Sequence, residues 1–281
     1  MRIVSWNIRW GCGRDGRIDL DAIVAVLRTL NPDVICLQEV AVNHPGLEGN
    51  ASANQYNHLA TAFSDFDAIY APASDMNGDN GRRLFGNLLL SRFTVTQALR
   101  HSLPWPADPV GLAGMPRVMI EAVIDSPIGR MRVLTTHLEY YSSIQRMAQI
   151  RHIRNLHQEA CEQARFFNVD PTLDAPFQLR RRPTSAVLCG DFNCTPDSPE
   201  YKEFSMPFAV DVPPLIDAWQ LQHGDAPNAP TAGLHGYAWP DQPDCYDYYF
   251  VTEDLGLRLR GIEVVNDTAA SDHQPIVLDI A

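Results

Sequence analysis

Short apolar runs recur along the whole sequence, each about as long as a β-strand. Most are bounded by Gly, Pro, Asn or Asp, which favour turns. Nine such runs predict strands: RIVSWNI (2–8), DVICLQEV (33–40), FGNLLLS (85–91), VMIEAVI (118–124), MRVLTTHL (131–138), SAVLCG (185–190), YDYYFV (246–251), LRLRGIEVV (257–265) and PIVLDI (275–280). Because strands are predicted near both ends of the chain, we expect a fold built on mixed β-sheets with outer helices.

Two segments have helical periodicity instead. In DLDAIVAVLRTLNPD (19–33) the apolar side chains at 20, 23, 24, 27 and 30 predict a helix that ends at Asn31-Pro32. This helix lies between the first two predicted strands, which makes a strand–helix–strand unit. A second helix is predicted over 142–167, with Ser142 or Ser143 as its cap. Residues 168–184 and 223–244 are expected to be loops, and loops of such length are often functional.

The composition indicates a globular protein. The 281 residues are 45% hydrophobic, which supports a large core, and we see no repeat or linker, so we expect one domain over residues 1–281. The 22 Lys and Arg against 34 Asp and Glu give a net charge of −12, which disfavours non-specific binding to nucleic acid or anionic membranes. A protein of this charge that handles phosphate would need metal ions.

The sequence also bears on the compartment. No segment approaches the roughly 18 uninterrupted apolar residues of a membrane span, and the N-terminus lacks a basic region followed by a long apolar stretch. The six cysteines show no C-x-x-C spacing, which favours free core thiols over disulfides. We therefore expect a cytoplasmic protein. Nothing in the sequence indicates an obligate protein partner.

Polar side chains stand at the ends of several predicted strands. Asp191 and Asn193 follow the run VLCG, Glu39 follows VICLQ, and Asn7 interrupts the first run. A carboxylate fixed at the end of a strand is well placed to bind a metal or to act as a general base. Each has an ordinary alternative, because Asp and Asn are common turn formers and Glu39 could be a hydrogen-bonded polar group of the core.

The same arrangement recurs further along the chain. His137 ends the run VLTT, Asp247 lies among aromatic residues in YDYYF, and Asp272 and His273 directly precede the last run. Taken singly, these could be a packed core histidine, a turn acid and a loop pair. Six strand ends with such groups indicate one shared site instead.

In this order the motifs resemble the endonuclease/exonuclease/phosphatase superfamily, which includes pancreatic deoxyribonuclease, exonuclease III-like AP endonucleases, neutral sphingomyelinases and inositol polyphosphate 5-phosphatases. The resemblance covers nearly the whole chain and implies a four-layer α/β/β/α sandwich of two packed mixed β-sheets flanked by helices. It rests on Asn7, LQEV (37–40), GNLLLSR (86–92), THL (136–138), GDFN (190–193), DYYF (247–250) and SDHQP (271–275).

The resemblance also implies roles for these residues. Glu39, with Asn7 beside it and Asp272 as a further ligand, would bind a divalent metal, Mg²⁺ or Mn²⁺. Oxygen ligands of this kind suit Mg²⁺ on chemical grounds as well. Arg117 occupies the place of an arginine that some members use near the phosphate, although an Arg beside a strand is often on the surface.

The remaining motif residues are implied to act on the substrate. Asp191 would activate or orient water, and Asn193 would hold the phosphate or the transition state. His137, and His273 oriented by Asp247, would contact the oxygens of the scissile phosphate. Such a division of tasks matches what phosphoester hydrolysis needs, because charge on the phosphoryl oxygens must be neutralised while a water is held in line.

We therefore expect a metal-dependent hydrolase that cleaves a phosphodiester or phosphomonoester by direct in-line attack of water. The substrate would be a small molecule or a nucleic acid, and a DNA endonuclease or exonuclease is the main alternative. A non-catalytic phosphate-binding module is a third hypothesis. The chain lacks the basic, aromatic-rich loops of DNA-cleaving relatives, and LRRRPT (179–184), its one basic cluster, is interpreted as a solvated turn. A serine hydrolase is excluded because no G-x-S-x-G motif is present.

Two further features concern the substrate cleft. The loops 103–117 and 223–244 are expected to line it, and Trp105 or Trp239 would either stack on a base or sugar or pack in the core. Tyr246 stands before Asp247 where the family more often has Ile or Val, which makes the position of that acid less certain.

Overall fold

The computed structural model describes residues 1–166, 172, 177, 181–208, 211–237 and 239–281. Parts of the predicted loops 168–184 and 223–244 therefore lie outside the described residues. The described strands form two sheets. The first runs in the spatial order β12 (Leu259–Val264), β13 (Ile276–Ile280), β1 (Arg2–Asn7), β2 (Val34–His44), β5 (Gly81–Ser91) and β4 (Asp67–Gly78), with β3 (Ala51–Asn54) paired to β2. The second runs β10 (Leu215–Asp217), β11 (Asp247–Thr252), β9 (Ala186–Asp191), β8 (Gly129–His137), β7 (Val118–Ser126) and β6 (Val95–Ser102).

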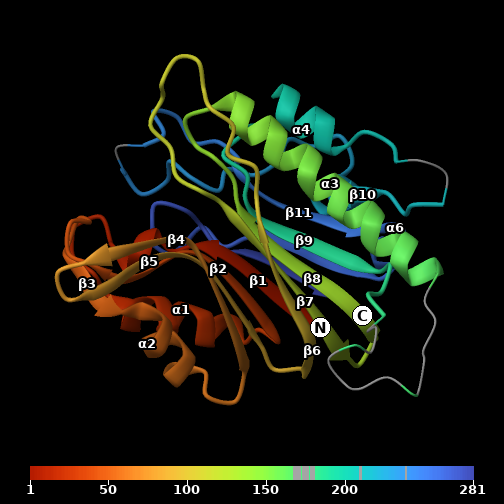
Figure 1. Ribbon diagram of the computed structural model, residues 1–281, viewed down its shortest axis with the longest axis horizontal. Coiled ribbons are helices and arrows are strands. Elements are labelled where there is room, and N and C mark those ends of the chain that lie inside the picture. Colours follow the sequence, from red (N-terminus) through yellow and green to blue (C-terminus); the bar gives the residue numbers. More distant parts are fainter. Residues whose placement is uncertain (167–171, 173–176, 178–180, 209–210, 238) are drawn as a thin grey trace.

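Helices cover the outer faces of both sheets. Helices α1 and α2 lie on the first sheet, and α3 and α4 lie on the second (Figure 1). The described helices are the short 3-10 turn η1 (Arg9–Gly11), α1 (Leu20–Leu30), α2 (Gln55–Ala62), α3 (Ser143–Arg165), α4 (Pro199–Phe204), α5 (Ala218–His223) and α6 (Glu253–Gly256). As predicted, α1 ends at Asn31 and Ser142 caps α3; Asp19 caps α1, and Asn31 adopts the left-handed conformation.

Three apolar cores separate the four layers. Ile3 and Val34 of the first sheet pack against Val187 of the second, which fills the space between the sheets. The next residue along β1, Val4, faces the other way and packs under α1, because side chains alternate along a strand. On the far side, Ile150 and other residues of α3 pack on the second sheet. The predicted four-layer sandwich of two mixed sheets flanked by helices is confirmed.

One parallel strand pair lies in each sheet. β1 and β2 are parallel in the first sheet, and β8 and β9 are parallel in the second. The crossovers of these pairs contain α1 and α3 respectively. Since the carboxyl ends of two parallel strands lie at the same edge of a sheet, polar residues at those ends become neighbours.

All nine predicted strands are present, and the helix predicted over 142–167 is α3, although residue 167 lies outside the described part of the chain. The sequence interpretation missed four of the strands in the described residues, namely β3, β4, β6 and β10. β4, β6 and β10 are edge strands of their sheets. The residues of β4 and β6 are mostly half-buried or exposed, and β10 has only three residues, so these strands lack the continuous apolar runs that mark the central strands.

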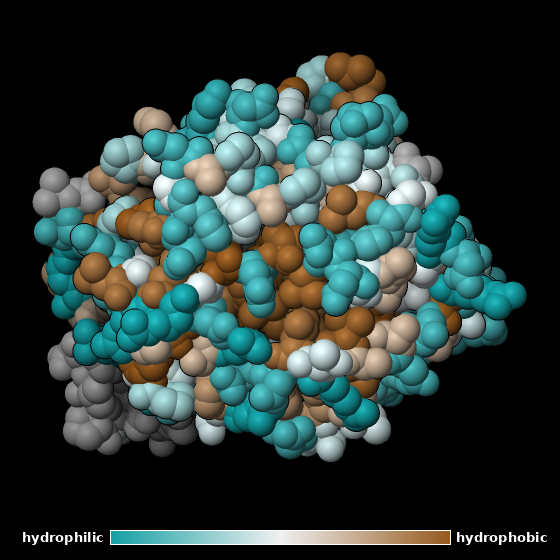
Figure 2. Space-filling model, turned by 180° about the vertical axis from the view of Figure 1, so that it is seen from behind, coloured by the Kyte–Doolittle hydropathy of each residue, from teal (hydrophilic) through white to brown (hydrophobic). Residues whose placement is uncertain are grey.

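The cysteines are free and buried, as predicted: Cys12, Cys36, Cys161, Cys189, Cys194 and Cys245. None of the helices in the described part of the chain combines the length and the apolar character that crossing a membrane requires. On the face opposite to that of Figure 1, hydrophilic residues cover much of the periphery and hydrophobic residues gather near the centre (Figure 2).

Candidate active site

The strand ends bring the predicted residues together. His137, Asp191 and Asp247 lie in one row across the second sheet, because His137 is the register partner of Asp191 and Asp191 is that of Asp247. Asn7 ends β1 in the facing sheet, and its amide donates a hydrogen bond of 2.9 Å to the Asp191 carboxylate. Both sheets therefore contribute to one cluster.

Gly190 allows the second sheet to close tightly beside this cluster. Its φ is +139°, and a Cβ at this position would overlap the carbonyl oxygen of Thr136 on β8. Two residues beyond Asp191, Asn193 has a φ of 49° and turns the chain away from the strand. The motif GDFN thus has a backbone reason for its glycine as well as a chemical reason for its polar residues.

The predicted metal ligands lie where acidic groups face one another. Burial and the nearby charge of Asp272 raise the pKa of Glu39 to about 7, although its hydrogen bond of 3.2 Å from Asn7 acts in the opposite direction. Glu39 also has a φ of 62°, an uncommon backbone conformation that concentrates at functional sites. Because the acids repel each other without a bound cation, the set Asn7, Glu39 and Asp272 fits a hard divalent metal.

A second acidic group also has the spacing of a metal site. One ligand atom each of Asp191, Asp247 and His273 lies within 4.8 Å of the others. The Nδ1 atom of His273, however, lies 2.8 Å from Asp247, which is a hydrogen bond within the group. We favour the Glu39 side for the metal because a histidine that is protonated by its acidic neighbours has no lone pair to give.

His273 is held as a cation by its surroundings. Burial lowers its pKa, but the charges of Asp247 and Asp191 and the hydrogen bond to Asp247 outweigh burial and raise the pKa well above the usual value. Thr231 donates a further hydrogen bond of 2.6 Å to Asp247, which fixes the acid. Tyr246, which stands before Asp247 where the family more often has Ile or Val, therefore does not move the Asp247 carboxylate out of the site.

His137 has the opposite charge state. Its pKa is lowered well below the usual value by burial and by the positive charges of Arg117 and His273. Its Nε2 atom lies 2.9 Å from the amide nitrogen of Asn193, which suits a neutral ring that accepts this hydrogen bond. The Nε2 atom of His137 also lies 3.4 Å from the carboxylate of Asp191. The pKa of Asp191 is raised to about 6, mainly by burial.

Arg117 is not a surface residue. Its side chain is 7% exposed and lies 3.2 Å from the buried carboxylate of Glu139, so the surface alternative is wrong. The sequence interpretation missed Glu139, although an acid two residues beyond His137 was a visible signal. Glu139 also accepts hydrogen bonds from the backbone of Met115 and Tyr141, and so joins two segments beside the site.

The solvated-turn interpretation of 179–184 is wrong for one of its arginines. Arg182 is 5% exposed and makes two hydrogen bonds, of 2.9 and 2.8 Å, to the buried carboxylate of Glu121. Residues 179 and 180 lie outside the described part of the chain. Arg182 therefore joins the segment before β9 to Glu121 of β7.

A cavity of about 260 Å³ opens over the cluster. Met115 and Trp239 place parts of the predicted loops 103–117 and 223–244 on its wall, whereas Trp105 is not a lining residue. The sequence interpretation also missed Arg9 and Trp10. The residues that line the cavity are Arg9, Trp10, Glu39, Phe85, Met115, Arg117, His137, Tyr140, Tyr141, Asp191, Asn193, Trp239, Asp272 and His273.

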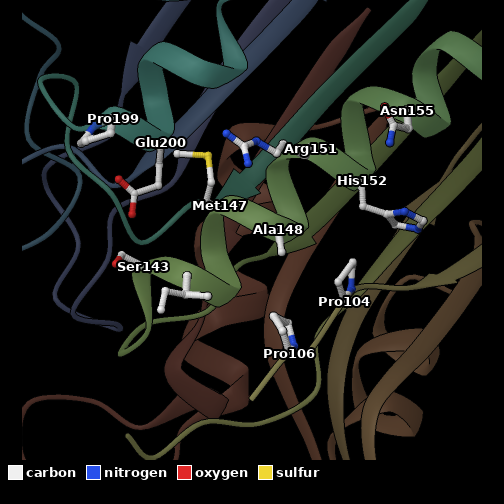
Figure 3. Close-up of a pocket in the computed structure, with 11 residues that line it drawn as sticks. Pro104, Pro106, Ser143, Met147, Ala148, Arg151, His152, Asn155, Pro199 and Glu200 are labelled. Atoms are coloured by element: carbon white, nitrogen blue, oxygen red, sulfur yellow. The ribbon is translucent and has the colours of Figure 1, made fainter. Parts of the chain in front are cut away.

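A larger groove of about 720 Å³ lies elsewhere, along α3 between the prolines of 104–106 and the start of α4. Figure 3 shows that Met147, Arg151 and His152 of α3 border it. None of the predicted site residues lines this groove. The smaller cavity is therefore the candidate active site.

Comparison with known proteins agrees with this geometry. The model of the endonuclease/exonuclease/phosphatase family matches residues 4–273. The chain belongs to this family. Comparison with curated proteins gives no match. Members of the family hydrolyse phosphoester bonds, which makes the cluster the expected place for such chemistry.

Several solved structures share the fold. An endonuclease/exonuclease/phosphatase from Beutenbergia cavernae is 23% identical, with a TM-score of 0.65 over 99% of this chain and 70% of the other. A mannosyl-6-phosphatase from Bacteroides thetaiotaomicron is 16% identical, with a TM-score of 0.66 over 100% and 99%. A 3′ phosphatase from Neisseria, bound to a product DNA hairpin, is 17% identical, with a TM-score of 0.63 over 100% and 99%. At these identities the likeness shows the fold alone.

Proposed function

We propose that the protein is a divalent-metal-dependent phosphoesterase that hydrolyses a phosphodiester or phosphomonoester by direct in-line attack of water. The observation that carries this proposal is the position of Asp191. Its carboxylate accepts a hydrogen bond from Asn7 and lies 3.4 and 3.7 Å from nitrogens of His137 and His273. Oxygen, amide and imidazole groups of this kind are what phosphoryl transfer requires around one phosphorus atom.

The metal site would lie beside Asp191. Glu39, Asn7 and Asp272 would hold Mg²⁺ or Mn²⁺, which when bound supplies positive charge for the phosphoryl oxygens. A cation held by these acids would allow a chain with a net charge of −12 to accept an anionic substrate.

The other residues would act on water and substrate directly. Asp191 would orient and deprotonate the attacking water, and the amide of Asn193 would donate to a phosphoryl oxygen. His273, kept protonated by Asp247, would offset the charge that develops on the phosphate, and His137 would contact a second oxygen. Arg117, held by Glu139, would bind the substrate from the cavity wall.

The test is an activity panel with Mg²⁺, Mn²⁺ or EDTA on bis-p-nitrophenyl phosphate, p-nitrophenyl phosphate and abasic duplex DNA. We expect EDTA to abolish hydrolysis, and Asp191→Asn to lower kcat on the order of 10² to 10⁴-fold, as for loss of a general base. Glu39→Gln should raise the Mg²⁺ concentration needed for half-maximal rate. Glu263→Gln, at an exposed position on β12, is the matched control and should behave as wild type.

The alternatives give different results. Preferential nicking of the abasic duplex would favour the nuclease hypothesis, which the DNA-bound relative from Neisseria also motivates. Binding of phosphate without hydrolysis of any substrate would indicate the non-catalytic module. Equal activity of wild type and Glu39→Gln at every Mg²⁺ concentration would contradict the metal assignment.

A further inference from the structure

Two parts of the cavity differ in chemistry. The buried His137, Asp191, Asn193 and His273 form one part of its wall, whereas aromatic rings from separate segments, all of them half-buried or exposed, form another. Trp10 of η1 lies 6.3 Å from Phe85 of β5, and Trp239 lies 5.6 Å from Tyr140, which follows β8. One aromatic pair thus belongs to the first sheet and its connections, and the other to those of the second sheet.

The backbone holds Trp10 in place at some cost. Arg9 and Trp10 both have a φ of 44°, a conformation that residues other than glycine rarely adopt and that persists only where its surroundings fix it. Here the buried Gln55 donates a hydrogen bond of 2.7 Å to the carbonyl of Trp10, and the indole nitrogen donates to the carbonyl of Glu48 at 3.0 Å. The ring is therefore set in advance on the cavity wall.

Trp239 is held by contacts with other rings. Its ring lies 5.1 Å from Tyr246 at an interplanar angle of 39° and 5.5 Å from His273 at 31°. Tyr246 is the residue that departs from the family pattern, and an aliphatic side chain would not offer this ring contact. The departure therefore accompanies an aromatic wall next to the catalytic imidazole.

We propose that the substrate is a phosphoester of one planar ring group, such as a single unpaired nucleoside, and that Trp10 and Trp239 determine this specificity. The inference rests on the phosphoesterase function proposed above. The cavity of about 260 Å³ lies just below the usual range for ligand sites, so it suits one ring and its phosphate. Aromatic faces bind any planar ring by stacking, with little preference for its hydrogen-bonding edge.

The kinetic test compares two esters with the same leaving group. One is the p-nitrophenyl ester of thymidine 5′-monophosphate, and the other is methyl p-nitrophenyl phosphate. Wild type should prefer the nucleoside ester in kcat/KM, and Trp10→Ala should lower this preference about 5- to 150-fold, the range for loss of one stacked base. Trp10→Phe should retain most of the preference. An unchanged preference in Trp10→Ala would overturn the proposal.

Trp105→Ala is the matched control for removal of an indole. Trp105 is 52% exposed and is not a lining residue of the cavity, so its loss should leave the preference between the two esters unchanged. A loss of preference in Trp105→Ala as large as that in Trp10→Ala would contradict the assignment of specificity to the cavity wall.

A binding test separates this inference from the proposed function. Calorimetry with Ca²⁺ in place of Mg²⁺ compares thymidine 5′-monophosphate, ribose 5-phosphate and inorganic phosphate. Tighter binding of the nucleotide that Trp10→Ala abolishes would support the ring site, even if neither ester were hydrolysed and the phosphoesterase function failed. Equal binding of ribose 5-phosphate and the nucleotide would overturn the ring site while leaving the phosphoesterase function standing.

Discussion

The buried carboxylate of Glu121 gives the sharpest stability prediction for this fold. Its two oxygens accept hydrogen bonds from Arg182 at 2.9 and 2.8 Å, one oxygen lies 3.0 Å from His101, and Arg132 lies at 3.7 Å. The side chains of Glu121 and Arg132 are fully buried. Burial raises the pKa of Glu121, but these hydrogen bonds and charges outweigh burial and lower it from 4.5 to about 2.

The lowered pKa sets the expected size of the effect. The difference between 4.5 for the unfolded chain and about 2 for the folded protein corresponds to roughly 3 kcal/mol, at 1.36 kcal/mol for each pKa unit. Because the folded pKa is the lower one, this stabilisation is fully present above pH 4.5. It is lost as the pH falls from 4.5 towards 2, where the folded protein also takes up the proton.

We therefore expect Glu121→Gln to lower the free energy of unfolding by about 3 kcal/mol at pH 7, since it also leaves buried arginines without their anionic partner. The difference from wild type should be constant from pH 7 to about 5 and narrow below pH 4.5. Urea denaturation followed by circular dichroism at pH 7, 5, 4 and 3 measures it.

A surface pair provides the control. Glu203 pairs with Arg151, whose side chain is 62% exposed, so Glu203→Gln should cost less than about 1 kcal/mol. A Glu121→Gln protein that is as stable as the control variant at pH 7, or a difference from wild type that does not change between pH 5 and 3, would refute the reasoning.

Two further predictions concern the site. Gly190→Ala should lower the free energy of unfolding by about 3 kcal/mol or more and impair activity, because the added Cβ would overlap backbone atoms of Thr136. Gly46→Ala should be near neutral, because a Cβ there meets nothing within 4 Å. Thermal denaturation compares the two variants, and equal melting temperatures would contradict the prediction. Glu139→Gln should raise KM about tenfold with a smaller change in kcat, because Arg117 loses the carboxylate that positions it. Steady-state kinetics measure both constants, and a fall in kcat alone would argue that Glu139 does not act by positioning Arg117.

The sequence predicts the centre of the fold better than its edges. The runs that become β1, β2, β9 and β11 are largely apolar, because both faces of these strands are covered. β4 and β6 lie at sheet edges and consist mostly of half-buried and exposed residues, and β4 contains Pro72, so neither forms an apolar run. The length of an apolar run therefore depends more on how well both faces of the strand are covered than on the strand propensity of its residues.

The residues of the site differ in the same way, because some can be recognised from their neighbours in the sequence and others only from partners that lie far away in it. Asp191 and Asn193 are visible because a polar residue after an apolar run is a local anomaly. Arg182 is not, since the buried carboxylate that pairs with it, Glu121, lies 61 residues away in the sequence. Arg9 and Trp10 reach the cavity through a turn in which both have a positive φ, a conformation that neither residue type predicts.

The net charge of the chain and the charge of its site act over different distances. Exposed charges more than about 8 Å apart are largely screened at physiological ionic strength, so a net charge of −12 governs encounters with long polyanions more than contacts inside a cavity. Within the cavity, Arg9 and Arg117 line the wall together with His273, whose pKa is raised well above its usual value. A small phosphoester can use these groups through short hydrogen bonds, whereas duplex DNA would also meet the outer surface of a chain whose net charge is −12. The same charge distribution thus favours a compact substrate over a long one without weakening the site itself.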